Sequence, residues 1–98
     1  MQTLTAILRT KPGQEETVKA ALLKVGSYVR DHEPDTLGFF VAQDPDDPCR
    51  FTTYERFTDG AAMDRHNEGE GSKGFFAEAG HLLDGPVTVV TAIEVFER

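Results

Sequence analysis

Apolar and polar residues alternate in four short segments of the chain. The first is TLTAILRT, residues 3–10, in which Leu4, Ala6 and Leu8 share one side. A period of two places successive side chains on opposite faces of the backbone, so it predicts a β-strand. The same period, with many aromatic and β-branched residues, predicts further strands over residues 36–43, 49–57 and 87–96.

Two other parts of the chain repeat apolar residues at helical spacing. Over residues 14–32 these residues recur at Val18, Leu22, Val25 and Val29, and Pro34 then disfavours helical backbone. A second helical part begins at residue 59, breaks at the glycines 69, 71 and 74, and then resumes. Its resumed apolar face consists of Phe75, Phe76, Ala79, Leu82 and Leu83.

The predicted elements follow one another in the order β-α-β-β-α-β. A hairpin between two helical segments is typical of the α+β class, and this order is that of a ferredoxin-like fold. Such a fold has a four-stranded antiparallel sheet with its helices on one face. Since 98 residues can bury one hydrophobic core but hardly two, residues 1–98 are expected to form a single domain.

The sheet face away from the helices carries more apolar residues than contact with water would favour. Phe39 and Phe40 are adjacent in one strand and therefore point to opposite faces. The last strand is apolar on both sides, with Val89, Ile93 and Val95 alternating with Val90, Ala92 and Phe96. A second copy packed sheet against sheet is the simplest cover for the free face, so we expect a homodimer.

Charge and terminal sequence limit the range of partners. The formal net charge of -7 argues against nucleic acid or an anionic membrane surface, because both would repel the chain. No segment approaches the roughly 20 apolar residues of a membrane-spanning helix. The opening MQTL lacks the basic and apolar regions of a signal peptide, so we expect a cytoplasmic protein.

Metal and thiol chemistry find little support in the sequence. Cys49 is the only cysteine, which excludes an intrachain disulfide and a thiol-rich metal site. His32 and His81 do not stand at metal-ligand spacing, and each is explained as a residue at or near a helix surface. No metal is therefore expected.

Residues 69–74, GEGSKG, match the G-x-G-x-x-G pattern of dinucleotide-binding proteins. In that motif the glycines follow a strand, whereas here they follow a predicted helix. Glu70 would also stand where the pyrophosphate binds. We therefore expect a flexible connection between two helical segments. If this connection has a function, it would be that of a gate over a pocket.

Glu55 and His66 are the candidates for acid–base chemistry. Glu55 lies in mid-strand on the same face as Phe51 and Phe57, so its carboxylate needs a partner or a raised pKa. His66 lies one helical turn after Ala62, on the side expected to meet the sheet. A pair formed by the two side chains can hold and move a proton, although a purely structural histidine fits the pattern equally well.

Aromatic residues are the candidates for contact with a flat ligand. Most aromatic side chains in a small domain belong to its core, but a core rich in them can also line an apolar cavity. The residues expected to bind such a substrate are Phe40, Tyr54, Phe75 and Phe76.

Several segments together resemble the antibiotic biosynthesis monooxygenase family. They are EPDTLG at residues 33–38, DPDDPCRF at 44–51, YERF at 54–57 and DGAAMDRH at 59–66. The likeness extends from KPG at residues 11–13 to LLDGPV at 82–87, so it covers nearly the whole chain. No single segment is diagnostic, and the resemblance depends on their order and spacing.

The resemblance implies a dimeric α+β barrel and an oxygenase activity. Members oxidise quinols, anthrones or related phenolic compounds with molecular oxygen and use no metal, haem or flavin. The protein would contribute a dry apolar pocket and a base that forms the reactive anion. His66 and Glu55 match the histidine and glutamate that recur in the family pattern.

Two other functions fit the same residues. An isomerase or lyase on this scaffold would need the acid–base pair but no oxygen. A dimer without catalytic activity that binds a small apolar ligand would need neither the acid–base pair nor oxygen.

Overall fold

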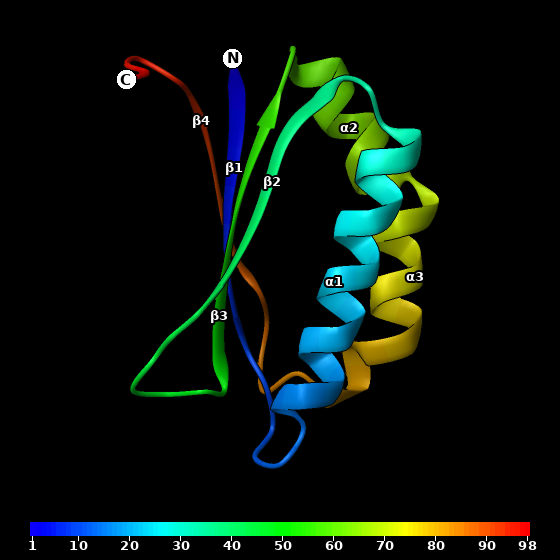
Figure 1. Cartoon of the computed structure of the whole chain (residues 1–98), viewed down its shortest axis with the longest axis vertical. Coiled ribbons are helices and arrows are strands. Elements are labelled where there is room, and N and C mark those ends of the chain that lie inside the picture. The colour runs from blue at the N-terminus through cyan, green and yellow to red at the C-terminus, as the bar shows by residue number, and fades with distance from the viewer.

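A computed structural model describes residues 1–98 and places four strands in one antiparallel sheet, with three helices on one of its faces (Figure 1). The strand order is β2-β3-β1-β4. This is the predicted α+β, ferredoxin-like fold. The elements are β1 (Gln2–Arg9), α1 (Glu15–His32), β2 (Thr36–Gln43), β3 (Arg50–Phe57), α2 (Gly60–Glu68), α3 (Glu70–Ala79), a 3₁₀ turn (Gly80–Leu82) and β4 (Thr88–Ile93).

The register of the strands decides which side chains meet the helices. β1 lies between β3 and β4, and its Ala6 is opposite Thr53 on one side and Val89 on the other. Because side chains alternate along each strand, Leu4 and Leu8 share the helix-facing side with Ala6. All three are buried, as the alternation in the sequence predicts.

The hydrophobic core lies between the sheet and α1 and α3. Phe51 and Phe57 of β3 are almost completely buried there, and Val18 is the most buried residue of α1. α1 turns its apolar stripe to the sheet and ends just before Pro34, as predicted. None of the helices is both long and apolar enough to cross a bilayer.

The glycine-rich segment is helical. α3 begins at Glu70 and passes through Gly71 and Gly74, so only Gly69, in extended conformation, separates it from α2. The predicted flexible connection or gate is therefore wrong. Gly71 serves the packing of α3 on α1, because a Cβ atom at this position would lie 2.8 Å from Cδ1 of Tyr28.

Two substitutions separate this packing role from helix propensity. A Cβ atom at Gly74 meets nothing within 4 Å, whereas one at Gly71 overlaps the Tyr28 ring. We expect Gly74→Ala to stabilise the protein by about 0.5–1 kcal/mol, because alanine favours helix. Gly71→Ala should destabilise it by about 1–3 kcal/mol, because the two helices must move apart. Urea denaturation of both variants measures this, and equal effects would contradict the close approach.

The last strand is shorter than predicted. β4 ends at Ile93 rather than at Phe96, and Val95 and Phe96 are 97% and 82% exposed beyond it. β4 is an edge strand that the helices do not cover, so Val89 and Ile93 remain exposed although they point to the helix side.

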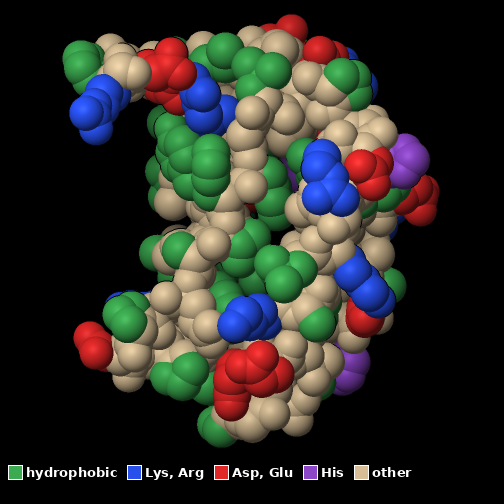
Figure 2. All heavy atoms as spheres, in the orientation of Figure 1, with side chains coloured by type: hydrophobic (Ala, Val, Ile, Leu, Met, Phe, Trp, Pro, Cys, Tyr) green, Lys and Arg blue, Asp and Glu red, His purple; other side chains and the backbone are tan.

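The opposite side of the sheet, called here the free face, is apolar at its centre. Each strand contributes a large exposed side chain to it, namely Ile7 of β1, Phe40 of β2, Tyr54 of β3 and Val90 of β4. Figure 2 shows hydrophobic side chains uncovered on the sheet side of the molecule. The free face therefore has the composition of a surface that packs against another layer.

Candidate active site

The imidazole of His66 lies between two carboxylates. His66 belongs to α2, whose first turn is capped by Asp59 through a 2.9 Å hydrogen bond from the Ala62 amide to its carboxylate. This cap supports the predicted start of the helix and sets which side of α2 meets the sheet. His66 is 4% exposed, with Nε2 3.0 Å from Oε1 of Glu55 and Nδ1 2.7 Å from Oε1 of Glu33.

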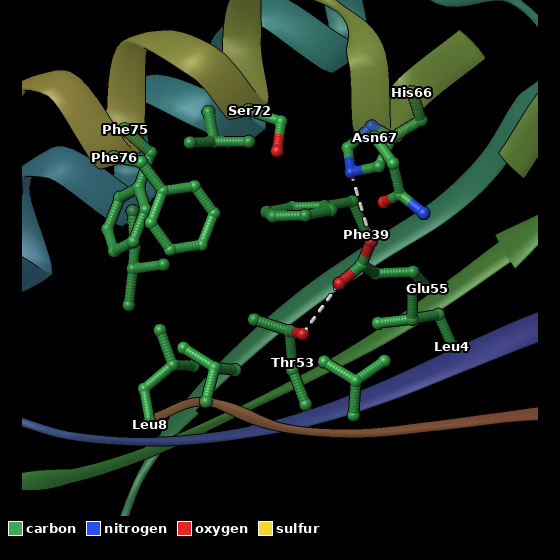
Figure 3. Close-up of a pocket in the computed structure, with 15 residues that line it drawn as sticks. Leu4, Leu8, Phe39, Thr53, Glu55, His66, Asn67, Ser72, Phe75 and Phe76 are labelled. Atoms are coloured by element: carbon green, nitrogen blue, oxygen red, sulfur yellow. Dashed lines mark hydrogen bonds and ion pairs between the residues drawn. The ribbon is translucent and has the colours of Figure 1, made fainter. Parts of the chain in front are cut away.

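Glu55 enters the site from the helix-facing side of β3. It is 5% exposed, and its second oxygen, Oε2, accepts a 2.7 Å hydrogen bond from the Thr53 hydroxyl, two residues earlier on the same face (Figure 3). Thr53 and His66 together give each carboxylate oxygen a donor. A buried carboxylate is tolerated only with such partners, so the contact between Glu55 and His66 explains its burial.

Glu33 completes the site and was not among the predicted residues. It follows the last turn of α1, and its Oε1 also accepts a 2.9 Å hydrogen bond from the Thr36 hydroxyl. Its other oxygen, Oε2, is buried without a hydrogen-bond partner. The sequence places Glu33 only at the end of a helix, next to His32, and the chain must fold before it reaches His66.

The two carboxylates control the protonation of His66. Burial of the ring by itself lowers its pKa, and the hydrogen bonds that the ring donates, first to Glu55 and then to Glu33, outweigh that effect, so the pKa is raised above its usual value of 6.5. The protonated ring donates from both nitrogens at once, which a neutral imidazole cannot do. The cluster is therefore best described as an imidazolium between two carboxylates.

A pocket opens beside Glu55 and His66, between the sheet and the helices. Its volume is about 110 Å³, and ten of its fifteen lining residues are hydrophobic. Phe75 and Phe76 project toward it from α3 and Phe39 from β2 (Figure 3). Its polar lining consists of Thr53, Glu55, His66, Asn67 and Ser72.

The four aromatic residues expected to bind substrate lie in two different parts of the structure. Phe75 and Phe76 line the pocket, whereas Phe40 and Tyr54 lie on the free face, with ring centroids 6.4 Å apart. The expectation that Phe40 and Tyr54 line the same cavity is wrong. Phe39 takes that place, because the pairing of β2 with β3 sets Phe39 opposite Glu55.

Two polar residues of the pocket were missed for a different reason. Ser72 lies in the stretch that was expected to be a flexible connection, and α3 instead presents it to the pocket, whereas Asn67 reaches the pocket from the last turn of α2. Neither has a distinctive sequence signal. No group of three or more histidine, cysteine, aspartate or glutamate side chains is arranged to hold a metal ion.

The arrangement suits removal of a proton from a bound molecule. A carboxylate at the wall of an apolar pocket can accept a proton from an acidic O–H or C–H group. The low polarity of the remaining wall strengthens that interaction, since little water competes with it.

Comparison with known proteins relates the chain to one family. Residues 1–78 match the family model described as antibiotic biosynthesis monooxygenase. No curated protein matches the sequence significantly.

Solved structures share the fold over nearly the whole chain. A protein from Nitrosomonas europaea superposes with a TM-score of 0.90 at 22% identity, covering 98% of this chain and 100% of that chain. An antibiotic biosynthesis monooxygenase superposes with a TM-score of 0.89 at 25% identity, covering 97% and 99%. PA3566 from Pseudomonas aeruginosa superposes with a TM-score of 0.87 at 26% identity, covering 97% of this chain and 94% of that chain.

Proposed function

The chain belongs to the antibiotic biosynthesis monooxygenase family, and on that premise we propose that it oxidises a small phenolic or quinol-like aromatic with molecular oxygen, without metal, haem or flavin. One atom of O₂ enters the substrate and the other leaves as water. The substrate supplies the electrons that reduce this second oxygen atom to water, and it is thereby oxidised to a quinone. The protein has to create the electron-rich anion and exclude water.

The observation that carries this proposal is the carboxylate of Glu55 at the wall of the apolar pocket. Glu55 would take the proton of the substrate hydroxyl, so that an O–H bond breaks and a carboxylic acid forms. His66 would remain protonated and hydrogen-bonded to Glu55. The cluster of Glu33, His66 and Glu55 has a formal charge of -1 before the transfer and is neutral after it, so no net charge accumulates in the protein.

Pocket size narrows the substrate. The volume of about 110 Å³ is somewhat smaller than the ~150 Å³ cavity that holds one benzene ring. A single ring that extends through the open side of the pocket suits this space, whereas most of a system of three fused rings would lie outside it. We therefore propose a substrate with one aromatic ring at the reacting end.

Oxygen consumption tests the proposed activity. We would measure O₂ uptake and product mass with substituted hydroquinones, simple phenols and an anthrone, with buffer and heated protein as controls. Uptake with a single-ring compound and a product that retains one oxygen atom from labelled O₂ is the expected result. No uptake with any compound would refute the activity, and turnover that is unchanged under nitrogen would indicate an isomerase or lyase.

We also propose that the protein works as a homodimer through the free face. The support is the row of exposed apolar side chains across all four strands, Ile7, Phe40, Tyr54 and Val90. Packing of two such faces would bury them together, and two-fold dimers are the commonest oligomers. Phe40 and Tyr54 would then belong to the interface.

A charged residue at the centre of the free face should separate the two copies. We expect Phe40→Glu to raise the dissociation constant of the dimer at least ~100-fold, because an unpaired buried charge costs about 3–5 kcal/mol. Sedimentation at micromolar concentration measures the change. Leu23→Glu is the matched control, since Leu23 is also exposed, at 56%, but lies on α1. A monomeric wild type, or equal effects of both substitutions, would contradict the interface.

A further inference from the structure

The ring of His66 forms part of the wall between two spaces. On one side is the apolar pocket, which Glu55 also lines. On the other side is a second, mostly polar cleft near the end of α1, which Glu33 lines together with Thr36. Glu33 does not border the pocket, so it would never touch a substrate bound there.

The contacts of Glu33 suit the fixing of one ring nitrogen. Its Oε1 accepts hydrogen bonds from His66 Nδ1 at 2.7 Å and from the Thr36 hydroxyl at 2.9 Å, so two donors hold one oxygen in place. Its Oε2 is buried and has no donor. A buried carboxylate with an unpartnered oxygen is costly unless a positive charge stays beside it, and the only group in contact with Glu33 that can carry one is His66.

We propose that Glu33 is a positioning residue of the active site, which keeps the His66 ring in one orientation with both nitrogens protonated, so that Nε2–H stays directed at Glu55. This inference rests on the proposed role of Glu55 as the base. Glu33 would then take part in the site although it lies on the side of His66 that faces away from the pocket.

The surroundings of the ring support an electrostatic role for Glu33. The aromatic rings of Phe39 and Phe57 lie against His66, with centroids 5.8 and 5.3 Å away, and neither carries charge. Of the charged residues of α2, Arg65 lines the adjoining cleft, and it pairs with Asp35. The charged or titratable groups around the ring are thus Glu55 from β3 and Glu33 from the end of α1. The adjoining cleft adds Tyr28, His32, Asp35 and Arg65.

Loss of Glu33 should change the titration of His66. A neutral His66 can donate from only one nitrogen, and without Glu33 no other side chain accepts a hydrogen bond from Nδ1–H. Both protonation states and both tautomers would then become accessible to the ring. The contact of Nε2–H with Glu55 would be one arrangement among several.

NMR titration of the imidazole nuclei of His66 in the full-length protein tests the inference without any substrate. We expect Glu33→Gln, which keeps the shape of the side chain but not its charge, to lower the pKa of His66 by about 1 unit or more. Asp35→Asn is the matched control, because it removes an exposed carboxylate nearby that pairs with Arg65 instead of His66. It should change the pKa of His66 by less than about 0.3 units.

Equal pKa values of His66 in the wild type and Glu33→Gln would overturn the inference. If Glu33→Gln does not fold, the wild type decides, because two slowly exchanging ring N–H protons at neutral pH support the inference and a single one refutes it. A failure to oxidise any aromatic would refute the proposed activity and leave this titration unchanged. The two proposals can therefore fail separately.

Discussion

Replacement of Glu55 by glutamine is expected to lower kcat about 10²–10⁴-fold, with little change in KM, on the substrate that the oxygen assay identifies. Glutamine has the shape of glutamate and can still accept a hydrogen bond from Nε2 of His66. It cannot take up the proton of the substrate hydroxyl. A loss of kcat without a loss of binding is therefore the mark of a base, because the group acts only as the proton moves.

A matched variant distinguishes this effect from a general change of charge. Glu78→Gln also replaces a glutamate by glutamine, but Glu78 lies exposed on α3 and pairs with Lys24. We expect its kcat and KM to remain those of the wild type. If Glu55→Gln keeps full activity, Glu55 is not the base, and the phenolic proton must leave by another route.

Replacement of His66 by alanine is expected to destabilise the protein by about 3–5 kcal/mol. The substitution removes the one donor that Glu33 and Glu55 share, and it leaves two buried carboxylates facing an empty space. Urea denaturation at pH 6 measures the difference in unfolding free energy. The exposed His32 provides the matched control, and His32→Ala should cost no more than about 0.5 kcal/mol.

The same pair of variants has a defined dependence on pH. Because the pKa of His66 is raised in the folded state, its charge contributes stability that is fully present below pH 6.5 and is lost as the pH rises through the folded pKa. The difference between wild type and His66→Ala should therefore be largest near pH 6 and shrink in alkaline solution. A difference that grows with pH would show that His66 is neutral in the folded protein.

Local pattern in the sequence was sufficient for most of the architecture. A period of two identifies strands and a period near 3.6 identifies helices, because each depends only on how successive side chains leave the backbone. The start of α2 at Asp59 follows from capping chemistry within four residues. Glu55 and His66 could be named because a carboxylate on a core-facing strand position and a histidine on a core-facing helix position are both unusual.

Contacts between distant parts of the chain needed the tertiary structure. The two faces of β2 look alike in the sequence, so only the pairing with β3 shows that Phe39 points into the pocket and Phe40 away from it. The glycines of α3 indicate a break when only their intrinsic preference is considered. The close approach of α3 to Tyr28 of α1 explains instead why Gly71 lies inside a helix.

The active site shows most clearly which features follow from local sequence and which need the tertiary structure. The sequence by itself determined the fold class and two of the three members of the cluster, Glu55 and His66. It could not supply Glu33, which is 33 residues from His66 and becomes its partner only when the end of α1 reaches α2. Residue type and spacing describe short-range geometry, whereas the pairing of buried charges depends on how the whole chain closes around them.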